Sequence, residues 1–174
     1  DGCVGPNGRT RKGIINITYS GARRFLPGFT SVTTFDNYSI DDVQVEGTRT
    51  VTNTAASTDE SPKFNITLVG GMLTWPDGST ATREVNKTRE WVRAASPAND
   101  SLIINGTAAG VTRGGANYNT VNTEIVFRRF CRWPVSGTKV VTTDNRVITI
   151  DFGDGDCDRQ ATVSVNGQSE EVNL

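Results

Sequence analysis

The chain has 174 residues, a formal net charge of -1 and 35% hydrophobic residues, so its length suits one globular domain or two small ones. Lysine and arginine are spread along the whole length, which argues against a nucleic-acid-binding or membrane-surface protein with a concentrated basic face. No apolar stretch approaches the ~20 residues that span a bilayer, and the absence of histidine excludes any mechanism that uses imidazole.

Residues branched at Cβ dominate the chain, with 24 threonines and 18 valines against one methionine. Such side chains suit a pleated, half-buried surface better than a helix. Alternation of apolar and polar residues recurs along the chain and helical spacing is rare. The composition and the pattern predict an all-β protein.

The first twelve residues form a glycine-rich lead, and the first apolar strand is expected over residues 13–19, where Ile15, Ile17 and Tyr19 alternate with polar residues. Further alternating runs occur over residues 64–68, 147–152 and 161–165. The turns between runs are expected at 75–78, 114–115, 144–145, 153–155 and 166–167.

The longest loops are expected over residues 52–62 and 94–100, which are small, polar and contain proline. Together the runs and turns predict an antiparallel meander of roughly ten or more strands, forming a β-sandwich or an elongated twisted sheet. We therefore expect a lead over 1–12 and one all-β domain over 13–174, with 94–100 as a candidate subdomain boundary.

The three cysteines leave an odd count and form no CxxC pair, so zinc and thioredoxin-like sites are not indicated. Cys131 and Cys157 flank two predicted strands, and a disulfide between them would close a loop of about 25 residues and contribute ~3 kcal/mol. Cys3 would then be a free thiol, an intermolecular partner or an alternative mate for either.

An acidic run over residues 151–158 has Asp154, Asp156 and Asp158 in alternation, as in the first half of a calcium loop. However, Arg159 stands where an EF-hand loop needs glycine, and no glutamate follows at the closing position. A hairpin turn is favoured over a calcium site, so no metal or cofactor is predicted.

The strand around Trp91 places Arg89, Trp91 and Arg93 on one face, an indole between long cations. Such a stripe can bind sugars or anions, although arginine stems more often simply cover an indole. Trp133, next to Arg132, has the same ambiguity. Packing is favoured over binding at both tryptophans.

Six N-glycosylation sequons occur, where about three are expected by chance. They are Asn16, Asn37, Asn65, Asn86, Asn99 and Asn105. Asn16 and Asn65 fall on the predicted outward phase of their strands, where a glycan is tolerated. The abundance of asparagine and threonine is the alternative explanation.

Several stretches carry a resemblance: GIINITYSG at 13–21, TTFDNYSIDD with VEGTRTVTN after it, LTWPDGSTATREVNKTREW at 73–91, and the ending PVSGTKVV, ITIDFGDGDCD and ATVSVNG. They look like those of an uncharacterised family of surface-directed, lipoprotein-like proteins from Bacteroidota. The resemblance implies no catalytic residues. It implies export and an anchoring cysteine at the mature N-terminus, whereas Cys3 here follows Asp1 and Gly2. It also makes Ser101 an O-glycosylation candidate, because Asp100-Ser101-Leu102 matches the acceptor pattern of that phylum.

A glycan-active enzyme would need two paired carboxylates, and nothing in the sequence marks out a pair among Glu46, Glu84, Glu90 and Glu124. We therefore expect a non-catalytic, extracellular structural subunit of a glycosylated cell-surface filament or coat, whose partner is a second copy. The competing hypothesis is a carbohydrate-binding or adhesive module that acts as a monomer on extracellular polysaccharide.

The expected mode of assembly is β-strand exchange. A terminal strand on a glycine-rich lead can leave its own sheet and bury Ile15, Ile17 and Tyr19 against a neighbouring copy. The alternative is that this strand pairs inside its own sheet in a monomer.

Overall fold

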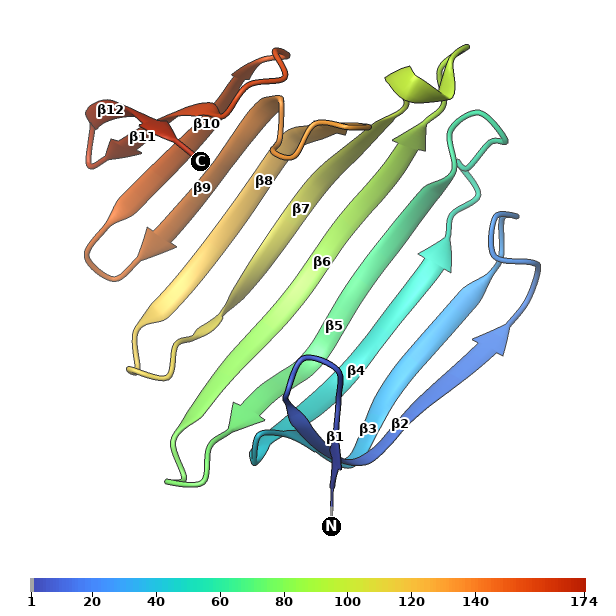
Figure 1. Cartoon of the computed structure of the whole chain (residues 1–174), viewed down its shortest axis with the longest axis vertical. Helices are drawn as coiled ribbons and strands as arrows, with labels where there is room; N and C mark the ends of the chain where they lie inside the picture. The colour runs from blue at the N-terminus through green and yellow to red at the C-terminus, as the bar shows by residue number, and fades with distance from the viewer. Residues whose placement is uncertain (1) are drawn as a thin grey trace.

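The computed structural model, which describes residues 2–174, is one open antiparallel sheet of twelve strands arranged in sequence order (Figure 1). The strands are β1 (Cys3–Val4), β2 (Thr10–Ser20), β3 (Thr30–Ile40), β4 (Val43–Asn53), β5 (Lys63–Thr74), β6 (Thr80–Val92), β7 (Ser101–Val111), β8 (Asn117–Arg128), β9 (Ser136–Thr143), β10 (Val147–Asp154), β11 (Gln160–Val165) and β12 (Gln168–Asn173). The predicted all-β meander is confirmed, and of the two predicted forms the chain adopts the twisted sheet.

Four of the five predicted turns, at 75–78, 114–115, 144–145 and 166–167, are confirmed between consecutive strands. The turn predicted at 153–155 comes later, because β10 continues past a register shift to Asp154 and the connection to β11 covers residues 155–159. The loop predicted over 94–100 contains a short 3-10 turn, η1 (Pro97–Asn99). The strands before and after it, β6 and β7, stay paired as far as the loop, where Val92 lies opposite Ser101. Strand β2 begins at Thr10 rather than Gly13, since a register shift beside Gly13, whose φ is +84°, lets pairing with β3 continue. No helix of the described residues is long and apolar enough to cross a membrane.

The sheet is a single layer, and all substantial contacts between strands join neighbours in the sheet. One side, here called the apolar face, carries Ile17, Tyr19, Val51, Ile66 and Trp91, as the cross-strand register shows. No second layer of the described chain covers this face, so Ile17 remains 50% exposed and Tyr19 66% exposed. The buried core is correspondingly small.

The opposite side is here called the threonine face. One row of paired residues crosses it from β2 to β12 through Thr18, Val32, Thr50, Thr67, Asn86, Thr107, Val121, Val140, Thr149, Ser164 and Ser169. Opposed threonine pairs and β-branched pairs stabilise neighbouring strands. The abundance of threonine is thus explained by a long, wet sheet surface rather than by a core.

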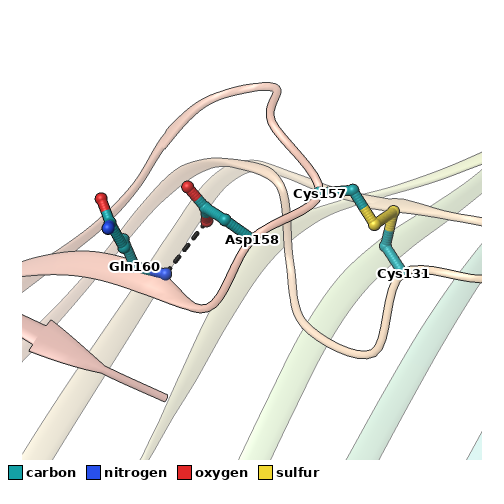
Figure 2. Close-up of a disulfide and its surroundings, with 4 residues drawn as sticks. All are labelled: Cys131, Cys157, Asp158 and Gln160. Carbon is teal, nitrogen blue, oxygen red and sulfur yellow. Dashed lines mark hydrogen bonds between the residues drawn. A yellow bond between two sulfur atoms is a disulfide. The ribbon is translucent and has the colours of Figure 1, made fainter.

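The C-terminal strands are tied to the sheet by the predicted disulfide, which is confirmed (Figure 2). Cys131 lies in the β8–β9 connection and Cys157 in the β10–β11 connection, with 5.5 Å between their Cα atoms. Next to it, the Asp158 carboxylate accepts a hydrogen bond from the Gln160 backbone N–H at 3.0 Å. Cys3 is an exposed free thiol.

The β5–β6 turn is braced by a charged contact. Asp77 accepts hydrogen bonds from the backbone N–H and the hydroxyl of Ser79 and from the Arg113 guanidinium. These hydrogen bonds lower the pKa of Asp77 to about 2, and the two from Ser79 contribute most. The carboxylate is therefore ionised, and the turn fully braced, at neutral pH.

Candidate functional site

A groove of about 350 Å³ crosses the apolar face over strands β2 to β7. Its aromatic lining comes from Tyr19, Phe25, Phe29, Phe64 and Trp91. Tyr19 and Phe29 stack with ring centroids 6.1 Å apart, and Phe25 meets Phe64 edge to face at the same separation. The groove is therefore bounded by rings that fix one another rather than by isolated side chains.

The β2–β3 loop, residues 21–29, forms one end of the groove. Asn53, which is 1% exposed, holds it there: its side-chain amide donates to the Arg24 carbonyl at 3.1 Å. Its backbone pairs with both Gly28 and Phe29. Because backbone and side chain act together, Asn53 fixes Arg24 and Phe25 at the rim.

Trp91 is fixed in the same way at the other end. Its indole N–H donates to the Asp100 carboxylate at 3.1 Å, and that carboxylate also accepts the Ala94 backbone N–H. The hydrogen bond from the Ala94 backbone N–H is the main cause that lowers the pKa of Asp100 below its usual value, and the hydrogen bond from the indole lowers it further. The indole is thus pre-oriented, with 42% of the residue exposed.

The charges that line the groove are all positive. Arg24, Arg49 and Arg89 contribute to its wall, and no carboxylate of the described residues lines it. Arg24 also lies over the Phe25 ring, 5.8 Å from the centroid. Flat apolar rings with guanidinium groups beside them suit a partner that is anionic and presents a flat or apolar surface.

The structure brings together only part of the predicted ligand face. Arg89 and Trp91 line the groove, whereas Arg93 and Trp133 do not. Trp133 lies in the β8–β9 connection beneath Arg132, whose guanidinium is 5.4 Å from its ring centroid. Its indole nitrogen is buried without a hydrogen-bond partner in the described structure. The arginine cover anticipated for an indole is therefore seen at Trp133.

Four predicted sequons share the threonine face. Asn16 pairs with Thr34, Asn65 with Thr52 and Thr88, and Asn86 and Asn105 lie at the same phase of β6 and β7. The other two sequons lie elsewhere: Asn37 has a left-handed φ of +47° in β3, and Asn99 is in η1. Ser101 begins β7 opposite Val92, at the same phase as Asn105, and so lies on the threonine face. The predicted outward phase of Asn16 and Asn65 is therefore the face opposite the groove.

The acidic run covers the end of β10 and most of the β10–β11 connection, with Asp154 ending β10 and Asp156 and Asp158 in the connection. No group of three potential ligands among the described residues is arranged to hold a metal ion. Of the glutamates considered for catalysis, Glu90 is paired with Lys63, and Glu84 accepts the Gly70 backbone N–H at 2.7 Å.

The strand predicted for exchange pairs within its own sheet. Ile15, Ile17 and Tyr19 lie opposite Phe35, Thr33 and Ser31 of β3. On its other side, β2 pairs only at Thr10 and Arg11, with the two residues of β1. Most of the outer edge of β2 is therefore free to pair in the described structure.

Comparison of the chain with models of protein families, with curated proteins and with solved structures found no match.

Proposed function

We propose that this chain is a non-catalytic, extracellular structural subunit of a glycosylated filament or coat, and that copies assemble by β-strand exchange. The observation that carries the proposal is the exposed area. The chain exposes 10925 Å², whereas a compact monomer of its 18.8 kDa mass exposes about 8,300 Å². The surplus of about 2,600 Å² exceeds what a standard protein–protein interface buries.

The edge of the sheet supports strand exchange as the mode of assembly. Ile14, Ile15, Ile17 and Tyr19 of β2 are 44–66% exposed, and an edge strand with free backbone groups is a ready template for another chain. Native proteins usually blunt such an edge with charge, proline or a short strand. Here β2 is eleven residues long, and past Lys12 it carries no charge or proline.

The threonine face supports the glycan part of the proposal. Asn16 and Asn86 are exposed there, so covalent sugar on this face would leave the groove uncovered. The disulfide between Cys131 and Cys157 is consistent with an oxidising compartment outside the cytoplasm. Intact mass of the native protein measures the glycans, and a mass equal to that of the bare chain would contradict this part.

Deleting residues 1–20 tests strand exchange, because it removes β1 and β2 and leaves ten consecutively paired strands. We expect the wild-type chain to form filaments by electron microscopy and the truncated chain to stay soluble without them. Deletion of residues 1–9 is the matched control: it removes β1 and Cys3 but keeps β2, and it should polymerise like wild type.

A synthetic peptide of residues 10–20 provides a second test on the intact protein. It should cap growing ends and shorten wild-type filaments in proportion to its concentration, whereas the same residues in scrambled order should not. Filaments that persist after deletion of 1–20, or a wild-type chain that never polymerises, would overturn the proposal.

The groove favours one second candidate, a carbohydrate-binding module that acts as a monomer. Trp91 is oriented by Asp100 beside Arg89, and stacking with a nearby guanidinium suits an acidic sugar. A monomeric wild-type chain that binds polygalacturonate would favour this candidate over the structural subunit.

A further inference from the structure

The apolar face carries a concentration of positive charge that the chain itself does not neutralise. Alternate residues of β6 place Arg83, Lys87 and Arg89 on this face, and the register adds Arg49 from β4 and Lys139 from β9. The four ion pairs of the described residues involve none of these five cations. Partial burial is the main cause that lowers the pKa of Lys87, and repulsion from Arg83 and Lys139 lowers it further.

The C-terminal strands carry the opposite charge. Residues 147–174 contain six carboxylates and one arginine. Five of the six, Asp151, Asp154, Asp156, Asp158 and Glu171, line a hollow of about 530 Å³. None of these five takes part in an ion pair of the described structure.

The two charged regions cannot meet within one chain. Asp151, Thr162 and Glu171 are paired across β10 to β12 at the phase of Thr149 and Ser164, which places the hollow on the threonine face. The cations lie on the opposite, apolar face of the same sheet, on strands β4, β6 and β9. Only a second molecule can bring the two regions together.

We propose that the groove of one copy packs against the acidic threonine face of β10–β12 in the next copy. Stacked sheets lie ~10 Å apart, a gap that long arginine side chains from the groove can bridge. The contact would cover aromatic rings of the groove and neutralise cations and carboxylates together. It is the charge complementarity and the surplus area that identify a second copy as the occupant.

This contact joins different surfaces of the two copies, so it is heterologous and repeats into an open filament unless it closes a ring. It rests on the proposed self-assembly and adds a second interface to strand exchange. The sequons agree with it, since the strands β10 to β12 contain none of the six. Glycans on Asn16, Asn65, Asn86 and Asn105 would leave the acidic end accessible.

Charge reversal on each side tests the contact. We expect Arg89→Glu and Glu171→Arg each to raise the critical concentration for assembly at least tenfold, measured by sedimentation. The matched controls are Arg146→Glu and Asp59→Arg, which make the same charge changes at exposed turn and loop positions outside both surfaces. These controls should assemble within about twofold of wild type.

Mixing the two reversed variants is the decisive arm. Each variant alone brings like charges together, but the glutamate at position 89 of one copy can meet the arginine at position 171 of the other. We expect an equimolar mixture to regain a critical concentration within threefold of wild type. Variants that assemble like the controls, or a mixture that does not recover, would overturn the proposal.

Other results separate this contact from strand exchange. Filaments that survive both reversals but disappear on deletion of residues 1–20 overturn the stacked contact and leave the proposed function standing. Loss of polygalacturonate binding in Arg89→Glu with unchanged assembly would make the groove a polysaccharide site and overturn the stacking. A wild-type chain that never self-associates would overturn both interfaces.

Discussion

Replacing Cys157 with serine is expected to lower the free energy of unfolding by about 3.5 kcal/mol, because the disulfide closes a loop with a sequence separation of 26 residues. The cross-link restricts the unfolded chain far more than the folded one, in which the cysteines already lie close together. Urea unfolding of the variant and of wild type, both as full-length chains at a concentration where they are monomeric, measures the difference.

Cys3→Ser is the matched control for this prediction, since Cys3 is exposed and free, and its stability should equal that of wild type within about 0.5 kcal/mol. The control is made in a chain that retains residues 1–20 and is measured below its assembly concentration. Treatment of wild type with a reductant should reproduce the loss seen with serine. A Cys157→Ser variant as stable as wild type would show that the cross-link contributes nothing.

Gly137→Ala is expected to destabilise the sheet by about 3 kcal/mol or more, through backbone strain and steric overlap together. Gly137 is the second residue of β9 and lies at a register shift with β8, at a φ of +94°, and a Cβ there would overlap the Glu124 carbonyl of that neighbouring strand. Since the obstacle is backbone in a paired strand, it cannot move aside as a flexible side chain would.

Gly78→Ala separates the two causes. Gly78 has a similar φ of +79°, but no atom lies within 4 Å of its Cβ position, so strain alone remains. We expect this control to cost about 1 kcal/mol. Thermal unfolding of both variants gives the comparison, and equal losses would mean that the overlap at Gly137 relaxes without cost.

The strand pattern and the turns were predictable because both are local properties. Ile15, Ile17 and Tyr19 alternate with polar residues over one strand, and Asn166-Gly167 fits a two-residue turn. The pairing of Cys131 with Cys157 followed from their position at the ends of a two-strand segment. In a meander, sequence neighbours are also spatial neighbours, so local reasoning reaches the topology.

The single layer and the groove were not predictable from the same patterns. Alternation shows that one face is more apolar, but it does not show whether a second layer covers that face. The groove joins Arg49 from β4, Phe64 from β5 and Arg89 from β6, which requires the register of several strands. The β2–β3 loop, where Arg24 and Phe25 lie, was missed, although Pro27-Gly28 is a turn signal.

The strand order of the sheet has a consequence for how the chain reaches this structure. Each strand from β2 to β12 pairs with the strand that precedes it in sequence, so every step of folding closes only a short loop. Hairpins can therefore form one after another as the polypeptide emerges during synthesis, without waiting for the C-terminus. The same arrangement lets the sheet open strand by strand from its ends, as in a repeat protein. Amide hydrogen exchange should accordingly slow from the β2 edge toward the central strands. From the β12 edge, the disulfide should retard opening at β10, which lies between the two cross-linked connections.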